Sequence, residues 1–265
     1  MTLSPHSVPW YSRLSTMQKG YFYPWRSTIG ARHGEDVFPE LVFEHLRPEL
    51  DVLEVACAQG NLTLEMAPRC RSVLGYDATA DYIDLARAQA DARGVSNTTF
   101  VVHNSSAAAN GGSPRLPVED HSIDLFVNSK GPFHWFSDAA RVARPGAAIL
   151  MLVPDMTPLE PWTDLLPEIF RWPEPPDWAR STIEGRLGEA GLRLHSWWSF
   201  EVPELFLNPQ ELYVWRSWGF APDEVPTFEE CAPGLEQIFK EFAGPEGLAV
   251  RYRRHMWKAV LPINR

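Results

Sequence analysis

The sequence predicts an α/β fold, with a doubly wound, mostly parallel sheet and helices on both of its faces. Two observations predict it. Between residues 51 and 154, short apolar runs alternate with segments of helical periodicity, a pattern typical of parallel strands joined by crossover helices. The apolar runs also lack a polar face, as expected of strands covered on both sides. With two further runs near the C-terminus, the expected sheet has seven strands.

The elements of this first region follow one another in a regular order. Residues 1–35 are aromatic and read as irregular, and Asp36 is expected to cap a helix that Pro48 stops. Strands are expected at residues 51–56, 72–77, 99–104, 122–128 and 147–154. Gly60 and Asn61 are expected to open one helix. A second helix is expected at 79–93, ended by Gly94, and a third at 133–143, ended by Pro145 and Gly146.

The chain divides into three expected parts. Residues 1–35 form a lid segment, residues 36–153 a ligand-binding core, and residues 154–265 complete the sheet. The third part carries two Pro- and Trp-rich insertions, 154–180 and 203–247, which are expected to cap the substrate. Within it we expect helices at 182–190, 208–218 and 233–243, and strands at 192–202 and 250–261.

Composition narrows the functional classes. The chain has 265 residues, of which 45% are hydrophobic, so it can bury a sizeable core. Its formal net charge of −10 disfavours nucleic acids and anionic membranes as partners. Three scattered cysteines indicate a reducing, cytoplasmic compartment, and no spacing indicates a metal site. The sequence also predicts neither a secretory signal nor a membrane span.

Polar side chains stand where three of the expected strands end. Glu54 precedes a turn of small residues that opens a helix, Asp77 ends the next strand, and Asn104 ends the third. Small residues allow a ligand to approach the backbone, and an acid in this position can accept both hydroxyls of a ribose. Each feature alone also fits a tight turn or a helix cap, but their order favours a nucleoside ligand.

The stretch from Asp51 to Pro154 resembles the Rossmann-like core of class I S-adenosylmethionine-dependent methyltransferases. The segment VLEVACAQGNLT (52–63) resembles the first motif of this family, and LGYDATADYIDLAR (74–87) resembles the second. Later motifs of the family resemble SIDLFVNSKGPFHW (122–135), RVARPGAAILML (141–152) and EAGLRLHSWW (189–198).

The resemblance implies S-adenosyl-L-methionine as cofactor and assigns its contacts. The cofactor-binding residues it implies are Glu54, Ala56, Ala58, Gly60, Asp77, Ala78, Tyr82, Asn104, Ser105, Asn128 and Ser129. Asp77 would bind the ribose, Ala78 and Tyr82 the adenine, and Asn128 and Ser129 would lie near the transferred methyl group. The family's first two glycines are replaced by Ala56 and Ala58, which would be strained if the turn needs a positive φ.

The expected function is in-line transfer of a methyl group to a small-molecule acceptor. Aromatic residues in the lid and the insertions suit a flat, partly apolar acceptor. His134 is the first candidate for a general base and Tyr23 the second, although positioning alone can suffice. Arg26 could bind a carboxylate or face solvent. The oligomeric state does not follow from the sequence.

Other functions stay open. An NAD-dependent oxidoreductase needs a G-x-G-x-x-G turn, which the sequence lacks. An rRNA, tRNA or protein methyltransferase is a second alternative, although the one basic cluster, RYRR at 251–254, is expected to be a solvated strand face. A nucleoside-binding relative without catalysis is the third, because Ala56 and Ala58 could narrow the site.

Overall fold

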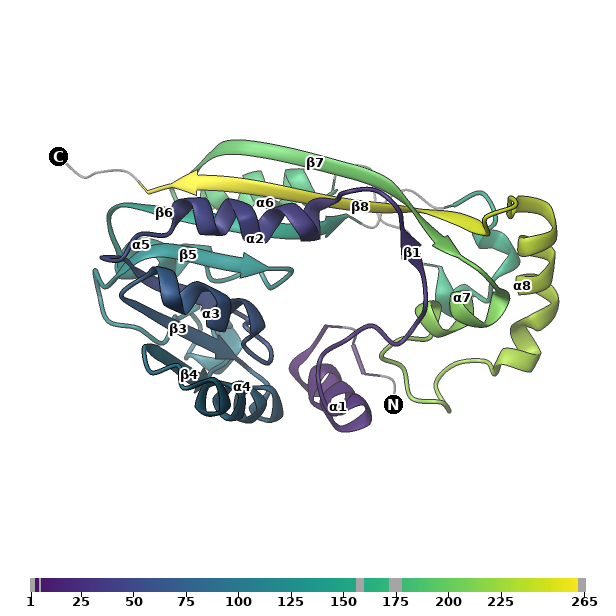
Figure 1. Cartoon of the computed structure of the whole chain (residues 1–265), viewed down its shortest axis with the longest axis horizontal. Helices are drawn as coiled ribbons and strands as arrows, with labels where there is room; N and C mark the ends of the chain where they lie inside the picture. Colours follow the sequence, from purple (N-terminus) through teal and green to yellow (C-terminus); the bar gives the residue numbers. More distant parts are fainter. Residues whose placement is uncertain (1–2, 5, 156–159, 172–177, 262–265) are drawn as a thin grey trace.

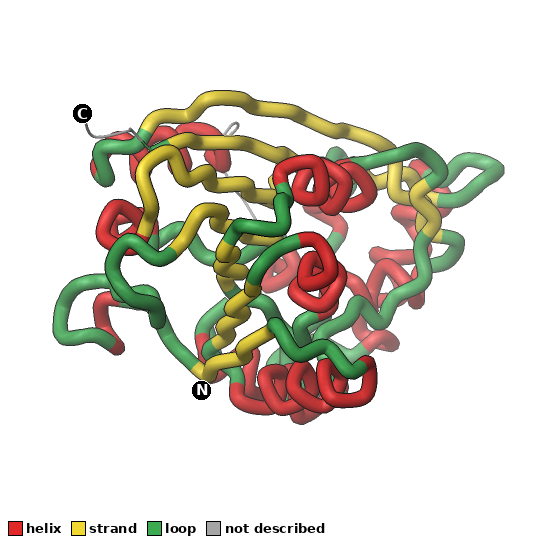
Figure 2. Tube along the Cα trace, turned by 60° about the vertical axis from the view of Figure 1, so that its left-hand side comes forward, coloured by secondary structure: helices red, strands yellow, loops and turns green. Residues whose placement is uncertain are grey.

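The computed structural model describes residues 3–4, 6–155, 160–171 and 178–261, which form one mixed sheet with helices on both faces (Figures 1 and 2). The strands are β1 (Thr28–Ile29), β2 (Asp51–Val55), β3 (Ser72–Asp77), β4 (Thr98–Val102), β5 (Ile123–Ser129), β6 (Ala143–Asp155), β7 (Arg193–Phe206) and β8 (Leu248–Val260). Their order in the sheet is β1-β7-β8-β6-β5-β2-β3-β4. Five strands that are adjacent in the sheet are parallel, namely β6, β5, β2, β3 and β4. Strand β8 is antiparallel to both of its neighbours, β6 and β7.

Within the described ranges, eight α-helices accompany the sheet, and some of them cover its two faces. They are α1 (Val8–Gln18), α2 (Gly34–His45), α3 (Asn61–Met66), α4 (Ala80–Arg93), α5 (Phe136–Val142), α6 (Trp178–Glu189), α7 (Pro209–Arg216) and α8 (Phe228–Phe242). Apolar residues of α5 and α6 pack on one face, where the fully buried Trp135 and Trp257 lie. Apolar residues of α2 pack on the other face, against β5 and β6. The doubly wound fold predicted from the strand–helix alternation is therefore confirmed.

Local sequence signals explain where several helices begin and end. Gly94 follows α4 with a φ of 65° and its N–H bonds back to the last turn, as predicted. The predicted cap of α2 was one turn off, because His33 is the N-cap and Asp36 stands at N3. The Asp36 carboxylate bonds back to the His33 N–H, which completes a capping box. The helix after β5 ends at Val142, and β6 includes Pro145 and Gly146.

The N-terminal part is more regular than predicted. Residues 8–18 form α1 and Thr28 and Ile29 form β1, where the sequence predicted an irregular segment. β1 pairs with the far end of β7 and makes the sheet eight-stranded rather than seven-stranded. This strand has no apolar run of its own, so only its partner reveals it.

Part of the chain lies beyond the parallel sheet, where α7 and α8 flank the ends of β7 and β8 (Figure 1), and apolar residues of the insertions form a separate cluster there. β7 and β8 continue as an antiparallel ribbon after β6 ends, with β1 along the outer edge of β7, and α7 and α8 connect β7 to β8. Trp162, Phe170 and Leu235 are among the residues buried between these helices and the ribbon. Of the predicted 154–180 insertion, residues 160–171 pack in this cluster, whereas 156–159 and 172–177 lie outside the described residues. Among the described helices, none has the length and apolar character needed to cross a membrane.

Candidate functional site

The turn after β2 has three residues in the left-handed region. Ala56 has a φ of 53°, Ala58 of 45° and Gly60 of 78°. At Gly60 a Cβ would also lie 2.7 Å from the Phe100 ring. Glycine is therefore required there for two reasons, the positive φ and the lack of space for a side chain. The turn therefore has the glycine-type backbone of a ligand-binding loop, with alanine at two positions that glycine favours.

We expect the substitutions Ala56→Gly and Ala58→Gly to stabilise the protein. A left-handed alanine costs about 1–2 kcal/mol. Glycine removes this cost, but it gives the unfolded chain more conformational entropy, which lowers the stability of the folded protein by about 0.5–1 kcal/mol. Urea unfolding should then show each variant about 0.5–1 kcal/mol more stable. As a control, Ala88→Gly changes an exposed residue in the middle of α4 and should cost about 1 kcal/mol. If Ala56→Gly or Ala58→Gly lowered the free energy of unfolding, the alanine at that position would not be strained.

Asp77 ends β3 beside this turn. Its Oδ2 accepts the Ala58 N–H at 3.1 Å and its Oδ1 accepts the Thr79 N–H at 2.9 Å. Burial raises the pKa of Asp77, although these donors counteract the shift. Each carboxylate oxygen keeps a lone pair for a further donor. Nearby, Tyr82 is buried and its hydroxyl has no hydrogen-bond partner within the described part of the chain.

Glu54 lies beneath the turn rather than at its surface. Its carboxyl group is buried and accepts a hydrogen bond from the Thr63 hydroxyl of α3. Burial raises the pKa of Glu54 to about 8, so it is mostly protonated at neutral pH. Glu54 therefore joins β2 to α3 and supports the turn from below.

The tips of β4 and β5 use most of their polar groups to hold their own loops. Asn104 Oδ1 accepts the Ser106 N–H at 3.0 Å. Asn128 is fully buried, and its amide bonds to Gly131 N and Pro132 O. Ser129 is only partly buried. This binding shapes the β5 loop so that it lies against the first turn, where a Cβ on Gly131 would come within 3.0 Å of the Ala56 methyl carbon.

His134 belongs to a polar chain between these two loops. Its Nε2 lies 3.0 Å from the Ser105 hydroxyl, which in turn lies 2.9 Å from the Tyr76 hydroxyl. Burial and the positive charge of Arg186 lower the pKa of His134, so the imidazole is neutral at pH 7. The Ser105 side chain is occupied by this network.

Aromatic residues from both ends of the chain cover the turn. We call Tyr21, Tyr23, Trp25 and Trp218 the aromatic roof. Tyr21 is anchored to the turn because its N–H donates to Gln59 Oε1 at 3.0 Å. Within the roof, the Tyr23 ring lies 4.7 Å from Trp25 and 5.2 Å from Trp218. The lid role of the N-terminal segment stays a prediction.

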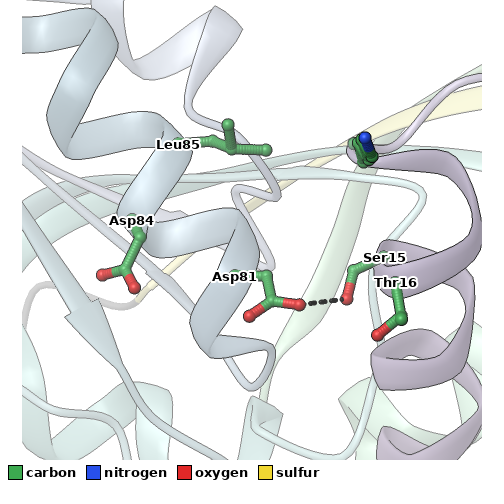
Figure 3. A pocket seen from close by; sticks show the side chains of 7 residues that line it. Ser15, Thr16, Asp81, Asp84 and Leu85 are labelled. Atoms are coloured by element: carbon green, nitrogen blue, oxygen red, sulfur yellow. Dashed lines mark hydrogen bonds between the residues drawn. The ribbon is translucent and has the colours of Figure 1, made fainter.

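Helix α1 extends the roof between α4 and the loop after α7 (Figure 1). The buried Ser15 hydroxyl donates to Asp81 of α4 at 2.8 Å, and Arg13 pairs with Glu224 on the opposite side. An open hollow of about 440 Å³ lies along the α1–α4 seam, bordered by Thr16, Asp84 and Leu85 (Figure 3).

Sequence patterns did not predict an ion cluster beside the β5 tip. Glu35 of α2 accepts from Lys130 Nζ at 2.8 Å and from Arg254 Nε at 2.7 Å. Arg254 was expected on a solvated face, but it is largely buried here. The RYRR segment is not a free basic patch either, since Arg251 pairs with Glu160 and Arg253 with Asp155. Across the described ranges, no group of three His, Cys, Asp or Glu side chains is placed to hold a metal ion.

Residues 52–151 match the model of a methyltransferase domain family. The uncharacterized methyltransferase YcgJ of Bacillus subtilis is 28% identical over 137 residues, 49% of this chain and 51% of that protein. The 23S rRNA (uracil(1939)-C(5))-methyltransferase RlmD of Klebsiella pneumoniae is 39% identical over 100 residues, 37% of this chain and 22% of its own length. This chain thus matches only about half of the first relative and less of the second.

Solved structures extend the likeness to the whole fold. A functionally unknown protein from Deinococcus radiodurans R1 superposes with a TM-score of 0.66 at 19% identity, over 94% of this chain and 97% of that chain. A putative methyltransferase from Bacillus halodurans superposes with a TM-score of 0.57 at 20% identity, over 86% of this chain and 100% of that chain. The predicted resemblance to methyltransferases is thus borne out over residues 52–151, and the solved structures share the fold of the chain as a whole.

Proposed function

We propose that this chain transfers a methyl group from S-adenosyl-L-methionine to a small-molecule acceptor. The observation that carries the proposal is the arrangement at the ends of β2 and β3, where the Asp77 carboxylate accepts the N–H of Ala58 in the left-handed turn. The buried Tyr82 hydroxyl supports it, because an unpaired buried hydroxyl costs about 1–3 kcal/mol and a nucleoside could satisfy it.

The residues fit the parts of this cofactor in order. Asp77 would accept the ribose hydroxyls, and Tyr82 and Ala78 would line the adenine. Ala56, Ala58 and Gly60 would lie along the methionine part, and the β5 tip with Asn128 and Ser129 would face the methyl group. Glu54 would act through the turn that it supports, and Asn104 and Ser105 would close the adenine side.

The chemistry needs positioning more than proton transfer. A bound sulfonium supplies an electrophilic methyl carbon, and the acceptor atom forms its bond to carbon as the sulfur–carbon bond breaks. The protein must align the acceptor and exclude water. The aromatic roof would provide both, together with the α7–α8 insertion that holds Trp218.

His134 and Tyr23 are not equivalent as candidates for the base. His134 is neutral at pH 7 and could accept a proton through Ser105. Burial and the neighbouring Glu35 raise the pKa of Tyr23 to about 12, so its phenol keeps its proton and would orient the acceptor as a donor. We therefore favour His134 if a base is used.

A small acceptor is favoured over RNA. The net charge is −10, and ion pairs occupy the arginines at 251, 253 and 254. The roof also suits a partly apolar molecule better than a phosphate chain. The three cysteines are free and buried, which supports a reducing compartment such as the cytoplasm.

Calorimetric titration tests the proposal directly. S-adenosylmethionine and S-adenosylhomocysteine should bind with micromolar affinity, and NADH should not bind. Binding of NADH alone would favour an oxidoreductase, and no binding by either sulfur nucleoside would refute the cofactor assignment. Binding without methyl transfer to any of a broad set of small acceptors would favour a non-catalytic relative.

A further inference from the structure

The ion cluster beside the β5 tip is assembled from distant parts of the chain. Its members are Glu35 from α2, Lys130 from the β5 loop, Arg254 and Tyr252 from β8, and Tyr23 from the roof. Lys130 Nζ donates one hydrogen bond to the Glu35 carboxylate and a second to the Tyr23 hydroxyl, at 3.1 Å. The Tyr252 hydroxyl donates to Glu35 at 2.6 Å. These contacts join the sheet, the core and the lid at one point.

The cluster holds more positive than negative charge. The side chains of Lys130, Arg254 and Glu35 are only 16%, 13% and 24% exposed. Burial alone would raise the pKa of Glu35, but Lys130 and Arg254 lower it to about 2, so it stays ionised. Within the described ranges, neither cation pairs with a second carboxylate. One positive charge is left in excess, and a buried charge of this kind is costly without a counter-charge.

The backbone places Lys130 with some strain. Its φ is 63°, a region that costs a residue with a side chain about 1–2 kcal/mol. The Lys130 N–H is held by Leu152 O of β6 at 2.8 Å. Such strain persists where the surroundings fix it, and it is often found at ligand sites. The next residue, Gly131, is the one that faces Ala56 in the first turn.

The roof connects the cluster to the far side of the site. Tyr82 stands beside Asp77, its ring lies 6.0 Å from Tyr21, and Tyr21 lies 6.0 Å from Tyr23. The Lys130 ammonium lies 4.9 Å from the centre of the Tyr23 ring. Contacts among these aromatic rings therefore link the residues beside Asp77 to Lys130.

We propose that Lys130 and Arg254, held in place by Glu35, bind a carboxylate at the methyl-transfer end of the site, an inference that rests on the proposed function. After their printed bonds, Lys130 keeps one N–H and Arg254 keeps its Nη2 group without an acceptor in the described part of the chain. Ammonium and guanidinium donors suit a carboxylate. The carboxylate comes either from the amino-acid part of the cofactor or from the acceptor.

Two nucleosides separate these sources. S-adenosylhomocysteine has an amino-acid carboxylate, and 5′-deoxy-5′-methylthioadenosine lacks it. If the cofactor supplies the carboxylate, Lys130→Met should weaken binding of the first at least tenfold and leave the second unchanged. Lys130→Arg should restore most of the affinity. Lys240→Met removes the same charge from an exposed position on α8 and should change neither.

Benzoate, with benzamide as its uncharged match, tests the acceptor. If the acceptor supplies the carboxylate, both nucleosides bind the Lys130→Met variant normally. Benzoate, but not benzamide, should then bind the wild-type complex with S-adenosylhomocysteine and fail to bind the variant complex. Normal nucleoside binding by the variant, with no benzoate binding to the wild type, would overturn this inference alone. Failure of the wild type to bind either nucleoside would overturn the proposed function as well.

Discussion

Asp77→Ala should lower the affinity for S-adenosylhomocysteine at least a hundredfold. Both carboxylate oxygens would lose their bonds to the ribose hydroxyls, and the N–H groups of Ala58 and Thr79 would lose their acceptor. Hydrogen bonds to a charged group contribute about 1.5–3 kcal/mol each, and two of them account for a hundredfold or more. Calorimetric titration gives the change directly.

A matched control is the exposed carboxylate of Asp84 on α4. Asp84→Ala removes a carboxylate that is 72% exposed and pairs only with Arg87 among its described neighbours. Its affinity should stay within about twofold of the wild type, because exposed pairs contribute little. The thermal midpoint of the Asp77 variant distinguishes lost contacts from lost folding. A folded Asp77→Ala protein with normal affinity would remove Asp77 from the site.

Glu54→Gln should make the protein more stable at pH 8.5 and change its pH dependence. The pKa of Glu54 is about 8 in the folded protein and about 4.3 in an unfolded chain. Its contribution to stability is complete below the unfolded value and is lost as the pH rises toward the folded value. The loss amounts to about 1.4 kcal/mol per pH unit, or roughly 3–5 kcal/mol in all. A glutamine cannot ionise, so it avoids this loss.

Urea unfolding at pH 5 and pH 8.5 measures the effect. The wild type should lose several kcal/mol more than Glu54→Gln between the two pH values, by the linkage above. Glu236→Gln, an exposed change on α8, should follow the wild type. Parallel pH profiles for the wild type and Glu54→Gln would show that Glu54 is ionised in the folded protein.

The core could be predicted because its signals are local. Each strand from β2 to β6 is an apolar run, and Gly60 and Gly94 mark turns that need a positive φ. Helix α1 and strand β1 carry no such signal. Ser15 and Arg13 hold α1 through contacts with Asp81 and Glu224, which no local pattern reveals.

The same contrast applies to the site. Asp77 and the Ala56–Gly60 turn follow directly from a strand end, so the sequence predicts both their position and their chemistry. Lys130 stands in a loop that looked like part of a motif, and its partner Glu35 is 95 residues away. The strand predicted at 192–202 is also longer than expected, since Pro203 pairs with Arg251 and β7 continues to Phe206.

The aromatic roof should give the protein an intrinsic spectroscopic signal. Trp218 lies within 6.0 Å of the ring centres of Tyr21, Tyr23 and Trp25. Rings held so close in a fixed, asymmetric arrangement produce near-ultraviolet circular dichroism, a signal that disappears when fixed packing is lost. Opening and closing of the site would therefore be visible without any label, and Trp218→Phe would identify the part of the spectrum that reports it.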